Sequence, residues 1–426
     1  MIHQGQPHPG ERHSRRRALA LMGAGVLAFS ATQLSPRLAM ARGLERPKSL
    51  ITVWLSGGPS QLETWDPHPG GKIGGPTQAI ETSIPGARIC EWYPQTAAIL
   101  KDFCVVRSVV SKEGDHERGT YVVRTGFRPE PTVVHPSLGS IVYHELPRGN
   151  LEIPGHVSLG DGPFATKGGY LGEEATAFRV FDPGRNLQNL EAPVEAPRHA
   201  RRLESLGKLS ESFLEGRRHQ IASSLHQKTI DAALKMMTSE QLKAFSLEEE
   251  PAALQAAYGD NSFGRGCLVA RRLVETGVRA IDVTLNGFDT HANNFGLCKS
   301  QAGYLDPALA SLVNDLKSRD LWNSTVVLVC GEFGRTPQIN PLDGRDHWPN
   351  GFSLLLGGGG LASGRVLGAT DPEGKKPPEN PIEIPQIMAT VLHVLGIDFH
   401  KEISTPIGRP IRLSTGSPAT DLLATT

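Results

Sequence analysis

The chain has 426 residues, of which 38% are hydrophobic, so it is long enough to bury one large core or two ordinary ones. Lysine plus arginine and aspartate plus glutamate both number 44, which gives a formal net charge of zero. That balance excludes a protein that captures nucleic acid by its overall charge. The five cysteines are odd in number and show no CxxC spacing, so they do not describe a framework of disulfides.

The first 41 residues resemble a twin-arginine-type signal peptide. Arginines at 15–17 precede an uncharged apolar run at 18–31, and Ala39-Met40-Ala41 then gives a small-x-small cleavage pattern. The apolar run is shorter than the roughly 20 residues that span a bilayer. We therefore expect the twin-arginine machinery to export the chain to the periplasm or the extracellular space, with no stable membrane span after cleavage. An uncleaved N-terminal anchor is the alternative.

The first half of the mature chain contains two strand-like runs among helical and irregular segments. The run at 49–55 (SLITVWL) ends in a Gly-Gly-Pro loop, and a second strand is predicted at 103–110. Helices are predicted at 94–101 and 137–146. Residues 147–195 are rich in glycine and proline, and the charged, helical pattern at 197–247 predicts a peripheral helical insertion.

The second half alternates helices and strands. Helices are predicted at 262–276, 302–319 and 385–395, and strands at 278–284, 324–330 and 352–356, the last broken by glycines at 357–360. Strands that lack in–out alternation and alternate with helices predict a mostly parallel sheet with helices on both faces. We expect one α/β domain over 42–412, followed by a flexible tail at 413–426.

Polar residues gather after the predicted strands, where sites form in parallel sheets. Four strand-to-helix loops and the segment that follows them supply the acidic, imidazole, guanidinium and hydroxyl groups: Ser56, Asp115, His116, Asp289, His291, Glu332, Arg335, Arg345, Asp346 and His347. If these loops meet on one rim, their carboxylates and imidazoles converge, which is how a divalent metal site is built.

Each of these clusters also has a purely structural interpretation. A loop hydrogen bond explains Asp289 with His291, and an ion pair with an arginine, Arg335 or Arg345, explains Glu332. Turn chemistry accounts for Asp346, a packed neutral imidazole for His347, and a helix cap with its first turn for Asp115-His116. The glycines at 357–360 lack the Lys-Ser/Thr of a phosphate loop, and no GxSxG motif marks a serine hydrolase.

Five motifs, in order, resemble the family called domain of unknown function 1501. They are WLSGGPS at 54–60, DHExGTY at 115–121, FDTHxN at 288–293, GEFGRTP at 331–337 and GRDHWP at 344–349. The resemblance extends over about 49–397. Members of that family look like distant, exported relatives of the sulfatase and alkaline phosphatase superfamily, so the resemblance implies an alkaline-phosphatase-like α/β fold.

The resemblance to sulfatases carries over only in part. It places Glu332 where a metal-binding aspartate would be, and Phe333 replaces the second ligand. His116 falls near the position of the nucleophile, where no serine, threonine or cysteine stands. The resemblance therefore implies the fold, but a sulfatase or phosphatase mechanism does not follow from it.

Two functions remain. The first is an exported metal-dependent hydrolase of an anionic ester, of the sulfate or phosphate type, in a small molecule or a polysaccharide. One divalent ion (Zn, Ca, Mg or Mn) would be bound by Asp289, His291, Glu332, Asp346 and His347. Asp115 and His116 would be catalytic, and Arg335, Arg345 and Ser56 would bind the substrate. The second is a non-catalytic exported binding or scaffold protein with the same fold, which the missing nucleophile favours and the density of acidic and imidazole groups disfavours.

Overall fold

The computed structural model describes residues 48–425, except 165, 186, 188, 189, 191, 193 and 216–224. The signal peptide predicted at 1–41 lies outside the described residues. No helix of the described part of the chain is long and apolar enough to cross a membrane.

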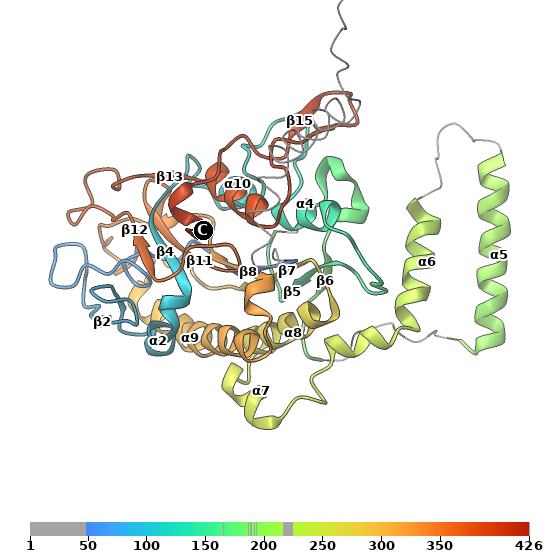
Figure 1. Ribbon diagram of the computed structural model, residues 1–426, viewed down its shortest axis with the longest axis horizontal. Helices are drawn as coiled ribbons and strands as arrows, with labels where there is room; N and C mark the ends of the chain where they lie inside the picture. The colour runs from blue at the N-terminus through green and yellow to red at the C-terminus, as the bar shows by residue number, and fades with distance from the viewer. Residues whose placement is uncertain are drawn as a thin grey trace, which may run out of the picture. The chain divides into compact units, whose positions relative to one another are not determined.

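The described residues contain a nine-stranded central sheet (Figure 1), in the order β12-β4-β11-β8-β1-β7-β5-β6, with β13 also paired to β4. Its strands are β1 (Ser49–Leu55), β4 (Phe103–Val110), β5 (His156–Leu159), β6 (Phe178–Val180), β7 (Ala280–Leu285), β8 (Thr325–Cys330), β11 (Phe352–Gly358), β12 (Arg365–Leu367) and β13 (Ile382–Glu383). The pairs that β11 makes with β4 and β8 are antiparallel, and the other pairs of this sheet are parallel.

Helices cover both faces of the sheet. One apolar cluster joins the sheet to α2 (Pro94–Ile99), α8 (Ser262–Thr276) and α9 (Asn294–Ser318). A second cluster joins the other face to α3 (His116–Thr125), α4 (Leu138–Glu145) and α10 (Ile384–Val394). In Figure 1, α8 and α9 lie below the sheet and α4 and α10 above it. The prediction of a mostly parallel sheet with helices on both faces is therefore confirmed.

Local sequence patterns located most elements closely. The bounds of β1, β4 and α8 are as predicted, because their buried apolar runs have clear ends. Strand β11 does not break at its glycines as predicted. It continues through Gly357 and Gly358, because they stay paired with Val327 and Val326 of β8. Glycine is needed there, since a side chain at Gly357 would meet the ring of Phe103 at 2.7 Å and one at Gly358 the carbonyl oxygen of Thr325 at 1.9 Å.

Helix α9 is longer than the pattern predicted. It begins at Asn294 rather than near residue 302, and it continues through Pro307. The remaining short elements are α7 (Ala252–Tyr258) and the two-stranded pairs β2 (Ala79–Glu81) with β3 (Arg88–Cys90), β9 (Gly334–Arg335) with β10 (His347–Trp348), and β14 (Glu402–Ser404) with β15 (Pro410–Arg412).

The predicted insertion at 197–247 contains helices, and parts of the segment predicted to be a flexible tail, 413–426, pack on the domain. Helices α5 (Ala196–Glu215) and α6 (Leu225–Met237) and a 3-10 turn (Glu240–Phe245) occupy the insertion. Beyond Arg412, Leu413 and Leu422 are fully buried in the cluster around α10, and Ser414 donates a hydrogen bond to the carbonyl of Pro385 at 2.9 Å. These apolar side chains therefore dock on the domain.

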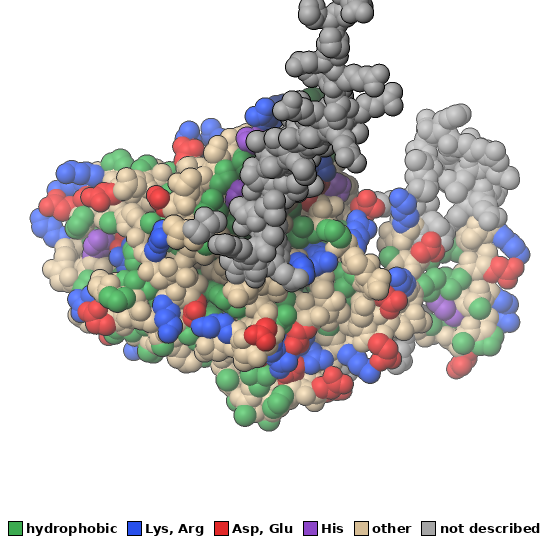
Figure 2. Space-filling view, viewed as in Figure 1, with side chains coloured by type: hydrophobic (Ala, Val, Ile, Leu, Met, Phe, Trp, Pro, Cys, Tyr) green, Lys and Arg blue, Asp and Glu red, His purple; other side chains and the backbone are tan. Residues whose placement is uncertain are grey.

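Strand direction brings the polar loops to one rim. The carboxyl ends of β1, β4, β7 and β8 share an edge because these strands are parallel. Strand β11 runs the opposite way, so the segment that leads into it, with His347, arrives at the same edge. On the visible surface, Lys and Arg are interspersed with Asp and Glu, as Figure 2 shows, in keeping with the zero net charge.

Three helices beside the sheet are joined by a buried ion network. Arg271 of α8 is 1% exposed and contacts Glu250 at 2.7 Å, Glu275 at 2.5 Å and Asp315 of α9 at 2.8 Å. Tyr258, the last residue of α7, donates to Asp315 at 3.1 Å. The network therefore fixes α7 and α9 against α8.

We expect Arg271→Met to destabilise the fold strongly, because it leaves buried carboxylates without their counter-charge. Loss of one partner of a buried ion pair costs about 3–5 kcal/mol. Denaturant unfolding of the wild type and the variant measures this cost. The matched control is Lys208→Met, which removes the exposed Lys208–Glu204 pair and should leave the midpoint almost unchanged. Equal midpoints for all three proteins would contradict this role of Arg271.

Candidate metal centre

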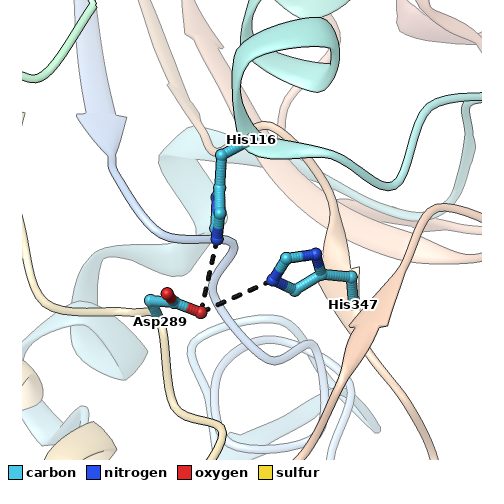
Figure 3. Close-up of side chains that lie close together, drawn as sticks. All are labelled: His116, Asp289 and His347. Atoms are coloured by element: carbon cyan, nitrogen blue, oxygen red, sulfur yellow. Dashed lines mark ion pairs between the residues drawn. The ribbon is translucent and has the colours of Figure 1, made fainter.

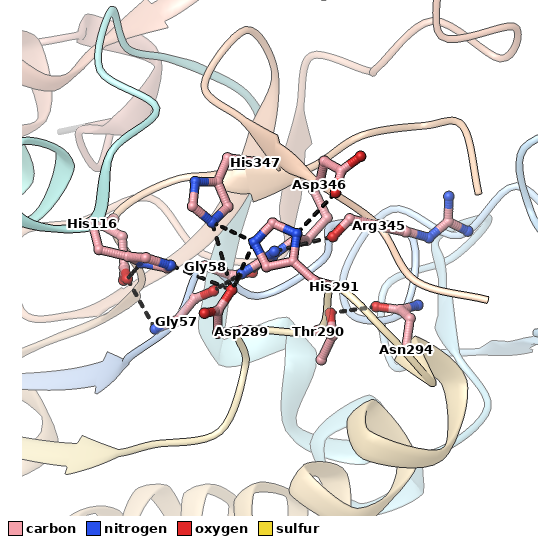
Figure 4. Close-up of polar contacts among 12 residues, drawn as sticks. Gly57, Gly58, His116, Asp289, Thr290, His291, Asn294, Arg345, Asp346 and His347 are labelled. Carbon is pink, nitrogen blue, oxygen red and sulfur yellow. Dashed lines mark hydrogen bonds and ion pairs between the residues drawn. The ribbon is translucent and has the colours of Figure 1, made fainter. Parts of the chain in front are cut away.

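The carboxylate of Asp289, in the loop after β7, is the centre of the polar cluster. Its Oδ1 lies 3.3 Å from Nε2 of His116, 3.2 Å from Nε2 of His291 and 3.5 Å from Nε2 of His347 (Figure 3 shows two of these contacts and Figure 4 the whole cluster). Ligand atoms of His116, Asp289 and His347 all lie within 4.8 Å of one another, so these three residues could hold a metal ion.

Each imidazole of the cluster is held by its other ring nitrogen. Nδ1 of His116 lies 2.7 Å from Oε1 of Glu332, and Nδ1 of His291 lies 2.8 Å from Oδ1 of Asp346. Nδ1 of His347 donates to the carbonyl oxygen of Gly114 at 2.6 Å. Protein metal sites orient their histidine ligands by this kind of hydrogen bond. The three Nε2 atoms are thereby directed at Asp289.

The spacing of these atoms suits a small divalent ion. Zn²⁺ binds imidazole nitrogen at roughly 2.0–2.1 Å, so two ligands of a tetrahedron lie about 3.3 Å apart. The contacts between Asp289 and the three imidazoles are 3.2–3.5 Å, and the Nε2 atoms of His291 and His347 are 2.9 Å apart. Imidazole with carboxylate favours zinc or a similar transition metal over calcium and magnesium, which prefer oxygen ligands alone.

Asp115 and His116, at the start of α3, were both predicted to be catalytic, but they make different contacts. Asp115 is the N-cap, and its Oδ1 accepts from the backbone amide of Arg118 at 3.0 Å. His116 is the first helical residue and reaches the cluster. The capping interpretation therefore holds for Asp115, whose exposed carboxylate serves the helix end.

Glu332 supports a histidine rather than pairing with an arginine. Its side chain is 1% exposed, and Oε1 contacts both Nδ1 of His116 and the backbone amide of Gly57 at 2.9 Å. Neither Arg335 nor Arg345, its predicted alternative partners, contributes a contact to it. Oε2 of Glu332 and Nε2 of His116 are buried without a hydrogen-bond partner among the described residues, as is expected of atoms that face a bound group.

Arg335 is fully buried beneath the cluster and is not placed to bind a substrate as predicted. Its guanidinium donates to the carbonyl oxygens of Gly57, Gly58 and Arg345 and to Oδ1 of Asp289, the last at 2.6 Å. Protein oxygen atoms accept a hydrogen bond from each nitrogen of this buried guanidinium. The role of Arg335 is therefore to position Asp289.

Arg345 and Ser56, the other residues predicted to bind the substrate, are also buried. Arg345 is fully buried, pairs with Glu63 at 2.8 Å and donates to the carbonyl of Pro337 at 2.6 Å. Its side chain extends away from the imidazoles in Figure 4. Ser56 is 5% exposed, and its carbonyl accepts from the amide of Phe288, which fastens the loop after β1 to the loop after β7.

The sequence patterns did not predict that the ring of Phe333 packs against the histidines of the site. Phe333 is fully buried, with its ring 5.0 Å from that of His116 and 4.6 Å from that of His347. Gly58 has φ +75°, and a Cβ there would meet the Phe333 ring at 2.6 Å, so glycine is required. The Gly-Gly pair after a buried strand was the sequence feature that could have predicted this close approach. No sequence pattern predicted that the Gly114 carbonyl would accept a hydrogen bond from His347.

The charges of the cluster do not balance when the imidazoles are neutral. Asp289, Glu332 and Asp346 carry three negative charges and Arg335 one positive, which leaves two negative charges. Burial is the largest single influence on Asp289 and opposes its ionisation, but the Arg335 hydrogen bond and the nearby positive charges together lower the pKa of Asp289. A hydrogen bond from His291 lowers the pKa of Asp346. Both carboxylates therefore stay ionised, and a divalent cation would neutralise the group.

The pKa values of two of the imidazoles are shifted in opposite directions. The hydrogen bond with Glu332 is the largest influence on His116 and raises its pKa above 6.5, with Asp289 adding to the effect. Burial lowers the pKa of His347. Its Nδ1 carries the proton given to Gly114, so its Nε2 presents a lone pair to the cluster.

Residues 47–423 match the family model described as "Protein of unknown function (DUF1501)", so the chain belongs to the DUF1501 family. This confirms the resemblance found in the sequence motifs. No curated protein sequence matches the chain.

Solved structures of the alkaline phosphatase and sulfatase kinds are similar to it. A protein in the alkaline phosphatase superfamily from Vibrio parahaemolyticus is 11% identical, with a TM-score of 0.34 over 84% of this chain and 68% of that one. The 2-O GAG sulfatase BT1596 is 11% identical, with a TM-score of 0.36 over 83% and 71%. A TAB5 alkaline phosphatase mutant with Mg bound is 12% identical, with a TM-score of 0.40 over 84% and 100%.

The raised pKa of His116 predicts how the stability of the metal-free protein depends on pH. A protonated His116 stabilises the fold fully below its ordinary value of 6.5, and this contribution is lost as pH rises through the higher folded pKa. The difference in unfolding free energy between wild type and His116→Gln should therefore shrink as the solution becomes alkaline. Denaturant unfolding of chelator-treated protein measures it. Glu332→Gln should remove the same dependence, and a difference that grows with pH would refute the assignment.

Proposed function

We propose that this DUF1501 protein is a metal-dependent hydrolase that acts on an ester of the sulfate or phosphate type. One observation carries the proposal: three anchored imidazoles direct Nε2 at a single carboxylate oxygen, that of Asp289. A loop stabilised only by its own hydrogen bonds has no need of three converging nitrogens. Such convergence is typical of a site for a divalent metal.

The residues divide into ligands and supports. His116, Asp289 and His347 would bind the ion. Glu332 holds the first of these and Arg335 the second, and neither reaches solvent. A divalent ion held here would polarise an ester oxygen and lower the pKa of a water molecule to about 7. The chain then needs no serine, threonine or cysteine nucleophile.

The charges at the site make the binding of an anionic ester depend on the metal ion. With its imidazoles neutral the cluster carries a net negative charge, which would repel a sulfate or phosphate ester from the metal-free protein. A divalent ion would cancel this charge. Because Arg335 and Arg345 are buried, the ion would also supply the positive charge that such an ester requires. Substrate binding should therefore depend on the metal.

We expect the mature protein, purified without chelators, to contain close to one equivalent of a transition metal. His347→Ala should lose it, because it removes a ligand. Asp115→Asn, the control, removes a carboxylate of the same rim but keeps the helix cap, and it should retain the metal. Elemental analysis and turnover of p-nitrophenyl phosphate and p-nitrophenyl sulfate measure these outcomes. A wild type that takes up no metal on titration would favour the non-catalytic binding protein instead.

We also propose that the chain is exported through the twin-arginine route to the periplasm or beyond. Arg16 belongs to both arginine pairs of the predicted signal, Arg15-Arg16 and Arg16-Arg17. All five cysteines of the chain are buried and free, so the fold needs no disulfide formed after export. A fold without disulfides agrees with the twin-arginine route, which exports proteins that have already folded.

Arg16→Lys should keep the charge of the leader but block its export, leaving the precursor in the cytoplasm. The control is Arg12→Lys, outside the arginine run, which should be exported and cleaved normally. Cell fractionation and the mass of the exported protein measure both, with a mature chain expected to start at Arg42. Normal export of the Arg16→Lys protein would overturn the twin-arginine assignment.

A further inference from the structure

The polar cluster contains two overlapping triads rather than one. Asp289 and His347 belong to both. His116 completes the first triad, and His291 completes the second, with Nε2 at 3.2 Å from Oδ1 of Asp289 and 2.9 Å from Nε2 of His347. Figure 4 shows the His116 and His291 rings on different sides of Asp289. The cluster therefore offers one more nitrogen than a three-ligand site uses.

His291 differs from the other two imidazoles in its exposure. Its side chain is 46% exposed, whereas His116 and His347 are 25% and 24% exposed. The carboxylates that bind the Nδ1 atoms of His116 and His291 differ in exposure in the same way. Glu332, which holds His116, is 1% exposed, but Asp346, which holds His291, is 57% exposed. The bond that orients His291 thus competes with water, and it is the weaker restraint.

The backbone at His291 is held by hydrogen bonds and close packing, whereas the side chain is held by solvent-exposed contacts. Its carbonyl oxygen accepts from Nδ2 of Asn340 at 2.9 Å, and the amide of Arg345 donates to the carbonyl of Thr290 at 3.0 Å. Gly344 packs so closely that a Cβ there would lie 1.9 Å from the His291 carbonyl oxygen. The contacts that hold the His291 ring, to Asp346 and His347, are both solvent-exposed, so a turn of the side chain would break exposed contacts.

We propose that His291 is an exchangeable fourth ligand, which rests on the proposed metal site. With His291 on the ion, four protein ligands fill a tetrahedral shell, and such closed sites are typical of structural metals. With His291 rotated away, His116, Asp289 and His347 remain and one position opens, as in catalytic sites. His291 thereby decides whether a substrate oxygen can reach the ion.

Cobalt substitution tests this role without requiring turnover. Chelator-treated mature protein is titrated with Co²⁺, and the visible spectrum reports coordination, because four-coordinate Co²⁺ absorbs more strongly than five- or six-coordinate Co²⁺. The variants are His291→Ala and His347→Ala, with His144→Ala as a matched control outside the cluster. Inorganic phosphate is then added as a probe of an open position.

The wild type and His144→Ala should show the strong four-coordinate spectrum. His291→Ala should still bind one Co²⁺, with affinity reduced about 10–100-fold, a spectrum whose bands shift because water takes the vacated fourth position, and a response to phosphate at lower concentration than the wild type. His347→Ala should bind none. Loss of Co²⁺ from His291→Ala would make His291 a fixed ligand, and a spectrum and affinity equal to the wild type would make it no ligand. A wild type that binds no Co²⁺ would instead refute the metal site itself.

Discussion

The buried guanidinium of Arg335 is the interaction on which the candidate centre depends, because it joins loops that are far apart in the sequence. It donates to the carbonyls of Gly57, Gly58 and Arg345 and to the carboxylate of Asp289. A cation removed from water must have its donors satisfied, so each partner is held in place. The position of Asp289 is therefore set by the packing of three loops and not by its own motif alone.

The sequence predicted the framework of this arrangement well because strand positions are encoded locally. Apolar, β-branched runs such as Ser49–Leu55 can be buried on both faces only in a sheet covered on both sides, which is typical of mostly parallel sheets. The meeting of the polar loops on one rim then follows from strand direction. What could not be predicted is the reversal of β11, since antiparallel pairing with β4 and β8 is a property of the whole sheet. That reversal brings His347 to the rim.

The gathering of the site residues could be predicted, but their roles could not. Arg345 looked available to a substrate because its partner, Glu63, lies in a segment without a distinctive pattern, 282 residues away. Asp115 fitted a cap and a catalyst equally well until the backbone fixed it as the cap. Which imidazole nitrogen faces the centre is likewise set by tertiary partners, such as the carbonyl of Gly114. Motifs specify side-chain chemistry, whereas orientation belongs to the fold.

The remaining question is why these groups would be kept together in a protein without a metal. The Gly114 carbonyl requires a proton on Nδ1 of His347, and burial opposes a second proton on its Nε2. That lone pair therefore faces the carboxylate oxygen of Asp289 at 3.5 Å and the Nε2 of His291 at 2.9 Å. Acceptors in such proximity repel one another unless a proton or a cation lies between them. An amide side chain would relieve the repulsion in a scaffold, so the presence of imidazoles here favours a cation.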